Sequence, residues 1–264
     1  MTSRHSISAW GLRGRRALRR FLYSQMALRD GAMIALGRDH PLVRFTVEDD
    51  PPSVYLVYRV ADPAALARHL ALPADIELAP IRCVADDEPE YLLTLNVYRV
   101  SGITNGLRAE WSTYIADPDG VPRYLVVDAR ADNTSMDPVD VITKKSVVRH
   151  ERRGDTVAIE IGEGASAYTA RFDVPSTAPA VKSHPDFVTA NDYIYWRNGV
   201  CDRTFYDAGL ADADQVSVAP DTVEIVDGTE WASFADATPE HVLVFREAIE
   251  FVVSPWANLE DLGR

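Results

Sequence analysis

Short segments rich in aromatic and β-branched residues recur along most of the chain. Residues 54–60 and 91–98 are the clearest examples, and their composition is that of β-strands. Turn sequences separate such segments, and residues 117–120 and 153–155 both suit β-hairpins. Further strands are expected at 107–115, 123–129, 146–152, 156–162, 168–174, 192–206, 215–226 and 247–253. The pattern predicts a mainly β protein.

A few segments follow a helical pattern instead. Apolar residues recur every three to four positions within residues 10–36, which predicts a helix there. Asp62 and Pro63 offer an N-cap and a first-turn proline for a short helix over residues 64–72. One helical turn is expected within residues 239–245. Mainly β with a few helices (α+β) is therefore the expected class, arranged as a large antiparallel barrel or sandwich.

Charge is distributed unevenly along the chain. The 264 residues carry a formal net charge of −13, which argues against a nucleic-acid partner. Residues 1–40 are nevertheless rich in arginine, and we interpret them as a basic helical arm. The arm would dock on a partner subunit or an anionic surface, or it would pack on its own domain with its arginines in water. Residues 41–264 are expected to form one domain.

The cysteine and hydropathy patterns indicate a compartment. Cys83 and Cys201 are far apart and form no disulfide framework or zinc motif, so we expect buried thiols in a cytoplasmic protein. No run of about 18 apolar residues is present, so no transmembrane helix is expected.

The sequence context does not support the common nucleotide-binding and metal-binding motifs. Residues 162–167 match G-x-G-x-x-A, but a strand follows them where a nucleotide site needs a helix, so we interpret them as a hairpin turn. The six histidines lack metal-ligand spacing. His150 and His184 would act as bases if the fold brought them inward, and otherwise lie on the surface or have partners. Glu160 and Glu163 are expected in solvent.

Lysine is rare, and two of the three lysines are adjacent. Lys144 and Lys145 lie between β-branched segments, and the third is Lys182. Lysine, unlike arginine, loses its proton readily when desolvated and can then attack a carbonyl carbon. A neighbouring ammonium group favours the deprotonated form further. The same pair at a strand end is also compatible with two solvated charges.

Several segments together resemble one known family. Residues 55–59, with Asp62 and Leu72-Pro73 after them, look like its early strand, short helix and Leu-Pro turn. The segment 108–112 lies where the family has a strand with a catalytic glutamate, and Lys144-Lys145 lies where it has adjacent lysines. Residues 223–231 resemble a late strand and a tryptophan-containing turn. Over about residues 54–255, the chain is similar to the acetoacetate decarboxylase family, as a divergent member.

The resemblance implies a fold and a chemistry. The fold would be an antiparallel β-barrel or cone around an apolar pocket, commonly in homo-oligomers, without a metal or an organic cofactor. Lys144 would form a Schiff base with a ketone, and Lys145 would favour its deprotonated form. Glu110 would handle protons. Arg108 would hold a substrate carboxylate, or it would form a structural ion pair with Glu110.

The implied activity is that of a lyase, of the decarboxylase, aldol or dehydratase type. Its substrate would be a β-keto acid or a related small carbonyl compound, for instance a larger intermediate of secondary metabolism. Two departures from the family keep alternatives open: residues 139–143 differ from the usual segment before the lysines, and residues 50–52 contain no arginine where the family has one. The alternatives are a barrel that binds a small molecule without covalent chemistry, and a cofactor-independent isomerase or cyclase.

Overall fold

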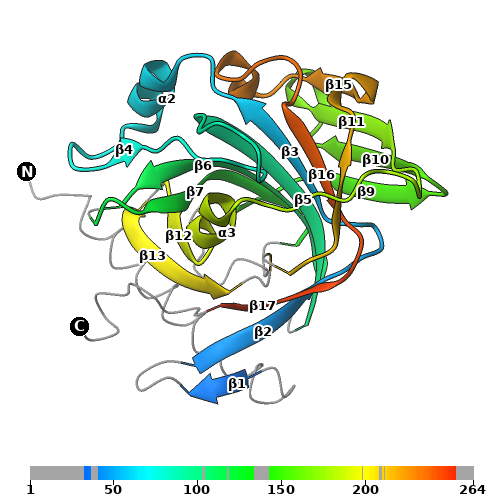
Figure 1. Ribbon diagram of the computed structural model, residues 1–264, viewed down its shortest axis with the longest axis horizontal. Coiled ribbons are helices and arrows are strands. Elements are labelled where there is room, and N and C mark those ends of the chain that lie inside the picture. Colours follow the sequence, from blue (N-terminus) through cyan, green and yellow to red (C-terminus); the bar gives the residue numbers. More distant parts are fainter. Residues whose placement is uncertain are drawn as a thin grey trace, which may run out of the picture.

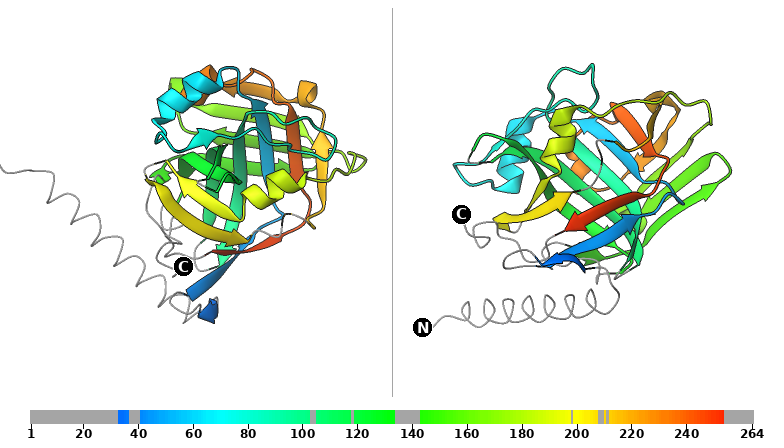
Figure 2. Two further views of the ribbon diagram at one scale, coloured as in Figure 1. Left: turned by 60° about the vertical axis from the view of Figure 1, so that its left-hand side comes forward. Right: turned by 60° about the horizontal axis from the view of Figure 1, so that its bottom comes forward.

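Two β-sheets form most of the protein. The computed structural model describes residues 33–36, 41–102, 105–117, 119–133, 143–197, 199–207, 210 and 212–253. Within these residues lie a 13-stranded main sheet and a four-stranded second sheet (Figures 1 and 2). None of the helices in the described part is long and apolar enough to cross a membrane.

The main sheet is largely antiparallel. Its strands are β1 (Met33–Leu36), β2 (Pro41–Val47), β3 (Val54–Arg59), β4 (Glu77–Leu78), β5 (Leu92–Gly102), β6 (Gly106–Ala116), β7 (Pro122–Ala131), β8 (Thr143–Lys145), β12 (Tyr193–Trp196), β13 (Gly199–Asp207), β14 (Gln215–Val218), β16 (His241–Phe245) and β17 (Ile249–Val253). The order is β1-β2-β17-β13-β12-β7-β6-β5-β3-β16-β14, and β2 also pairs with β5. Among the described pairings, only those of β8 and β12 with β7 are parallel.

The second sheet covers one face of the main sheet. Its order is β15-β11-β10-β9, from β9 (Val148–Arg153), β10 (Thr156–Ile161), β11 (Tyr168–Asp173) and β15 (Glu224–Asp227). Residues from both sheets form what we call the inter-sheet core, which includes Leu56, Trp111, Ile159, Phe172 and Trp231. The two sheets therefore pack face to face.

The opposite face of the main sheet holds a separate core around a helix. The helix α3 (Pro185–Ala190) lies within the curve of the main sheet (Figure 1). Its Phe187 is fully buried and packs with Tyr55 and Tyr114 in what we call the inner core. Each long central strand of the main sheet thus contributes alternate side chains to two different cores.

Most of the expected elements are confirmed. The strands expected at 54–60, 91–98, 107–115 and 123–129 are β3, β5, β6 and β7, and the expected short helix is α2 (Pro63–Leu70). Asp62 is its N-cap, with an oxygen that accepts the amide hydrogen of Ala65 at 2.9 Å. The mainly β class with a few helices is confirmed, whereas a closed barrel or cone is not.

Three expectations were wrong in detail. Residues 241–245 form the strand β16 and no helix, because this short apolar segment is buried on both faces and shows no clear period. The segment 192–206 forms two strands, and 215–226 divides between β14 and β15 in different sheets. Of the helix expected over residues 10–36, only Met33–Leu36 is described, and it is the strand β1.

A buried hydrogen bond joins the two sheets directly. The hydroxyl groups of Tyr58 on β3 and Tyr168 on β11 lie 2.8 Å apart. We expect Tyr58→Phe to cost about 1–3 kcal/mol of the free energy of unfolding, because the Tyr168 hydroxyl would then be buried without a partner. The double variant Tyr58→Phe/Tyr168→Phe should lose less than Tyr58→Phe alone, as measured by urea unfolding. Additive losses would contradict this interpretation.

Candidate active site

A small cavity opens on the inner face of the main sheet. Its volume is about 50 Å³, which is room for only a few water-sized groups. The lining combines aromatic rings with polar side chains from several strands, and includes Ser53, Tyr55, Asn96, Tyr98, Glu110, Tyr124, Asn191 and Phe251. We call this cavity the inner pocket.

The strand β6 supplies Glu110, the charged residue of the inner-pocket lining, and Arg108, its partner. Arg108 and Glu110 alternate with Ala109 and Trp111, so the two charges share one face and the apolar residues share the other. Arg108 and Glu110 are 3% and 6% exposed, and the guanidinium donates a short hydrogen bond to the carboxylate. The expected alternative of an ion pair is therefore present in the structure.

Other groups hold this ion pair in place. The Arg108 guanidinium lies 5.7 Å from the centre of the Trp196 ring, an arrangement that favours the cation. Asn96 on β5 is directly opposite Glu110 in the sheet, and its side-chain oxygen accepts a hydrogen bond of 3.4 Å from Ser53. Asn96 and Ser53 thus add polar groups to the pocket wall beside Glu110.

Tyr124 on β7 is a neutral phenol at the pocket. Burial raises the pKa of Tyr124 well above its ordinary value, and the Glu110 carboxylate adds to the rise, although the hydroxyls of Ser112 and Thr94 oppose it. The Tyr124 hydroxyl therefore keeps its proton throughout the neutral range and is suited to donate a hydrogen bond.

Lys144 lies on the other face of the sheet from Glu110. Its Nζ forms an ion pair of 3.0 Å with Oδ1 of Asp128, and its side chain is 61% exposed. Asp128 is almost fully buried and also pairs with Arg130 at 3.0 Å. Because Asp128 is opposite Trp111 in the sheet, it shares the Trp111 face and not the Glu110 face.

Lys145 lies on the same face as Arg108. Lys145 is paired with Ala131 of β7, and Ala131 is paired with Arg108 of β6. Paired residues in adjacent strands project to the same side, so Lys145 and Arg108 are two strands apart on one face, about 10 Å between their Cα atoms. Lys145 is exposed. The structure thus divides the two adjacent lysines between two faces.

An irregularity between β6 and β7 explains where Asp128 points. Trp111 is paired with Asp128 and Ser112 with Val126, so Val127 is an extra residue in β7. A β-bulge of this kind shifts the alternation of the following residues. Without it, Asp128 would share the face of Tyr124 and Val126.

The histidines considered as bases lie elsewhere. His150 is 2% exposed on β9 and neither ring nitrogen has a hydrogen-bond partner among the described residues, so the expectation of a surface or partnered histidine was wrong for it. His184 caps α3, where its Nδ1 accepts the amide hydrogen of Asp186 at 3.0 Å. Of the cysteines, Cys83 is buried and the side chain of Cys201 lies outside the described residues.

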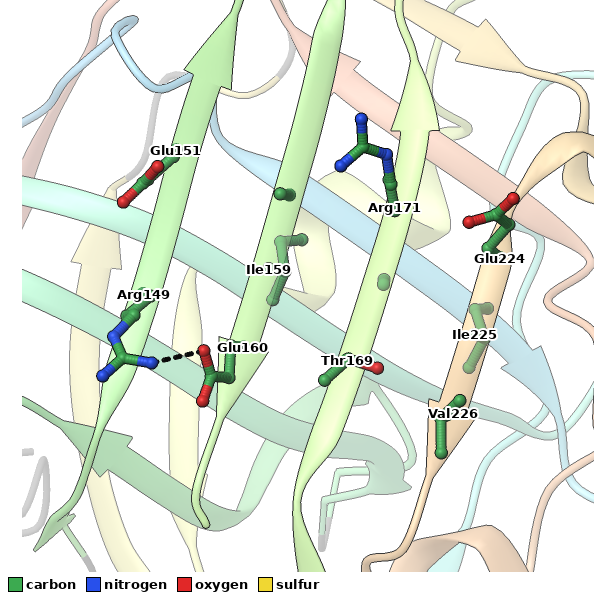
Figure 3. Close-up of a pocket in the computed structure, with 11 residues that line it drawn as sticks. Arg149, Glu151, Ile159, Glu160, Thr169, Arg171, Glu224, Ile225 and Val226 are labelled. Atoms are coloured by element: carbon green, nitrogen blue, oxygen red, sulfur yellow. Dashed lines mark hydrogen bonds and ion pairs between the residues drawn. The ribbon is translucent and has the colours of Figure 1, made fainter. Parts of the chain in front are cut away.

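A second hollow lies on the outer face of the second sheet (Figure 3). Its rim is charged, and Arg149 there pairs with Glu160 at 2.6 Å. These two side chains are 60% and 38% exposed, so Glu160 is solvated as expected. A solvated ion pair of this kind interacts only weakly. The inner pocket, with its buried charges, is the better candidate site.

Comparison with known proteins places the fold. No family model matches the sequence, and no curated protein matches it. The solved structure of acetoacetate decarboxylase from Legionella pneumophila subsp. pneumophila str. Philadelphia 1 is similar, with a TM-score of 0.50 over 86% of this chain and 92% of that chain. The chain has an acetoacetate decarboxylase-like fold. The sequence identity is 12%, so the comparison confirms the predicted resemblance at the level of the fold.

Two further solved structures were matched more weakly. One is an acetoacetate decarboxylase, at 12% identity and a TM-score of 0.46 over 85% of this chain and 94% of that chain. The other is an acetoacetate decarboxylase-like enzyme from Sphingomonas wittichii RW1, at 11% identity and a TM-score of 0.48 over 84% and 93%.

Sequence reasoning missed several residues of the site. Asn96 and Tyr124 line the pocket, and Asp128 holds Lys144, but none of them was a candidate. A signal existed for Asn96, since Thr94 and Asn96 interrupt an apolar strand at alternate positions. Residues 50–52 form the bend before β3 and supply no arginine, and the arginine nearest before them, Arg44, has its side chain outside the described residues.

Loss of one partner of the buried ion pair should be costly. We expect Arg108→Met to lower the free energy of unfolding by about 3–5 kcal/mol, because Glu110 would remain buried without its partner. The double variant Arg108→Met/Glu110→Met should regain most of this loss in chemical denaturation. The matched control is Arg149→Met, which breaks an exposed pair and should cost less than about 1 kcal/mol. Equal costs at the two sites would refute the assignment.

His150 should make stability depend on pH. Burial and then the charge of Arg99 lower the pKa of His150 to about 3, below its unfolded value of about 6.5. Between these values the unfolded state binds the extra proton, so stability falls as pH falls, by at most about 1.4 kcal/mol per pH unit. His150→Leu should remove this slope in denaturation curves between pH 6.5 and 4. An unchanged slope would exclude His150 as its source.

Proposed function

We propose that this protein is a carbon–carbon lyase that forms a Schiff base between Lys145 and a small β-keto acid. The observation that carries the proposal is the buried Arg108–Glu110 pair beside a small pocket, on the sheet face that Lys145 shares. The acetoacetate decarboxylase-like fold supports the reaction class.

The proposed reaction uses the lysine amine as a nucleophile. The unprotonated Nζ adds to the ketone carbon, water leaves, and an iminium ion forms. Carbon dioxide then departs, and the electron pair of the broken carbon–carbon bond moves into the iminium to give an enamine. The enamine carbon takes up a proton, and water hydrolyses the new iminium to release the ketone and the free lysine.

The other residues of the site have complementary roles in this proposal. Glu110 manages the proton at the enamine carbon, and Arg108 orients Glu110 or holds the substrate carboxylate. Tyr124 donates a hydrogen bond to a substrate oxygen. Lys144, paired with Asp128 on the opposite face, anchors β8 so that Lys145 is presented at the rim. The volume of about 50 Å³ favours a compact β-keto acid over a larger intermediate of secondary metabolism.

Borohydride trapping tests the proposal. The protein is incubated with a panel of β-keto and α-keto acids, reduced, and examined by intact mass and peptide mapping. We expect an added mass equal to the reduced substrate on Lys145. Lys145→Met should abolish the adduct and reduce turnover by at least about 10³-fold, as loss of a nucleophile does. Lys182→Met is the control, since it removes the third lysine at an exposed position outside β8, and it should retain the adduct.

The outcomes separate the proposal from its alternatives. An adduct on Lys144 would retain the mechanism and overturn the assignment of Lys145. No adduct from a folded sample would favour a pocket that binds a small molecule without covalent chemistry. Turnover that survives Lys145→Met but is lost in Glu110→Gln would favour a cofactor-independent isomerase or cyclase.

A further inference from the structure

We propose a second ligand site, in a cavity between the two sheets, that takes a small organic cation with an apolar body. The cavity has a volume of about 220 Å³, smaller than the roughly 300–1,000 Å³ of drug-sized sites. It lies where β15 meets the main sheet and is covered by a short 3₁₀ helix, Glu230–Ser233. The site is independent of the lysine chemistry proposed above.

Aromatic rings form much of the cavity wall. Tyr58 comes from β3, Trp111 from β6, and Trp231 from the 3₁₀ helix. Their exposed fractions are 7%, 3% and 1%, so the rings are held in the core and leave only a limited area toward the cavity. Leu93 and Ile225 complete the apolar part of the lining. Electron-rich aromatic faces attract ammonium groups, most strongly where water is excluded.

Two carboxylates supply negative charge at the same cavity. Asp227 ends β15, and Asp236 follows the 3₁₀ helix. One oxygen of Asp227 accepts the amide hydrogen of Thr229 at 2.8 Å, which fixes the carboxylate. Neither aspartate forms a salt bridge with the described residues. A ligand ammonium group would therefore meet carboxylates whose charge is not already neutralised by a contacting side chain.

The nearby arginines have contact partners other than the two aspartates. Arg59, whose charge interacts with Asp236, pairs with Glu240 at 3.1 Å and with Glu90 at 3.4 Å. Arg197 lies 5.6 Å from the centre of the Trp231 ring and donates to the carbonyl of His69 at 3.2 Å. The Arg59 guanidinium is thus held by partners outside the cavity lining, whereas the Arg197 guanidinium packs on the Trp231 ring of the cavity wall and forms no salt bridge with Asp227 or Asp236 among the described residues.

The electrostatic environment disfavours an anionic ligand. Burial raises the pKa of Tyr58 above its ordinary range, and the negative charge of Asp227 raises it further, although the hydrogen bond to Tyr168 opposes the rise. The field of Asp227 therefore reaches the tyrosine at the cavity wall. It would repel an anion at the place where it attracts a cation.

Strand alternation separates the cavity from the inner pocket. Trp111 follows Glu110 on β6, so the two residues face opposite sides of the main sheet, and the cavity and the inner pocket lie back to back. On β15, Glu224 and Val226 line the outer hollow shown in Figure 3 and Asp227 lines the cavity, whereas Ile225 lies between the two and lines both.

The test uses three probes of similar shape and different charge. N-methylbenzylamine is the cation, benzyl methyl ether the neutral analogue, and phenylacetate the anion. Binding is measured by calorimetry and by the indole N–H signals of tryptophan in NMR spectra. We expect the cation to bind at least about tenfold more tightly than the ether, as a charge-assisted contact implies, and to shift the Trp111 and Trp231 signals. Equal binding of the cation and the ether would overturn the proposal.

Matched variants locate the site. Asp227→Asn keeps the oxygen that accepts from Thr229 and removes the charge, so it should weaken binding of N-methylbenzylamine at least about tenfold. Asp221→Asn removes an exposed charge outside the cavity lining and should change the affinity less than twofold. If the Asp227→Asn variant does not fold, the Asp236→Asn variant is used instead, because Asp236 is exposed. It should weaken binding of N-methylbenzylamine at least threefold. Unchanged affinity in the folded variant would refute the site.

Discussion

Burial of β6 on both faces is the constraint on which the rest of the structure depends. Residues 107–115 are all buried, although Arg108 and Glu110 are among them. Two charges in such a strand are tolerable because each is the partner of the other, and Glu110 without Arg108 would be a buried carboxylate without its cation. Strand alternation then requires Trp111 and Ala109 to face the opposite side, where the second sheet covers them.

This constraint makes the register of β6 decisive. A shift of one residue would bring Arg108 and Glu110 into the inter-sheet core and Trp111 into the inner pocket. The inner pocket is polar and the inter-sheet cavity aromatic for the same reason, since successive residues of one strand supply the two linings. The chemistry of each face of the main sheet therefore follows from the register of β6, and not from the overall composition of this strand.

Much of the fold could be predicted from the sequence, because local signals agree with the tertiary structure. The aromatic and β-branched composition of β3 and the N-cap Asp62 are examples. The prediction failed at β16, where an apolar segment buried on both faces has no period to distinguish strand from helix. It also failed to separate β14 from β15, since nothing local indicates that the chain passes from one sheet to the other.

The candidate site was less predictable, because its geometry depends on a single extra residue. Glu110 and Arg108 could be identified as a pair from their spacing alone. The position of Lys144 could not be identified in this way, because it follows from the bulge at Val127. The bulge turns Asp128 away from the inner pocket, and Asp128 is then the partner of Lys144 on the far face. β8 contains only three residues, so its pairing with β7 alone decides which lysine faces Arg108. A slip of one residue that paired Lys144 with Ala131 would turn Lys144 to the face of Arg108 and place Thr143 opposite Arg130. The ion pair between Lys144 and Asp128 opposes that slip, because the slip would leave the buried Asp128 without one of its two cations.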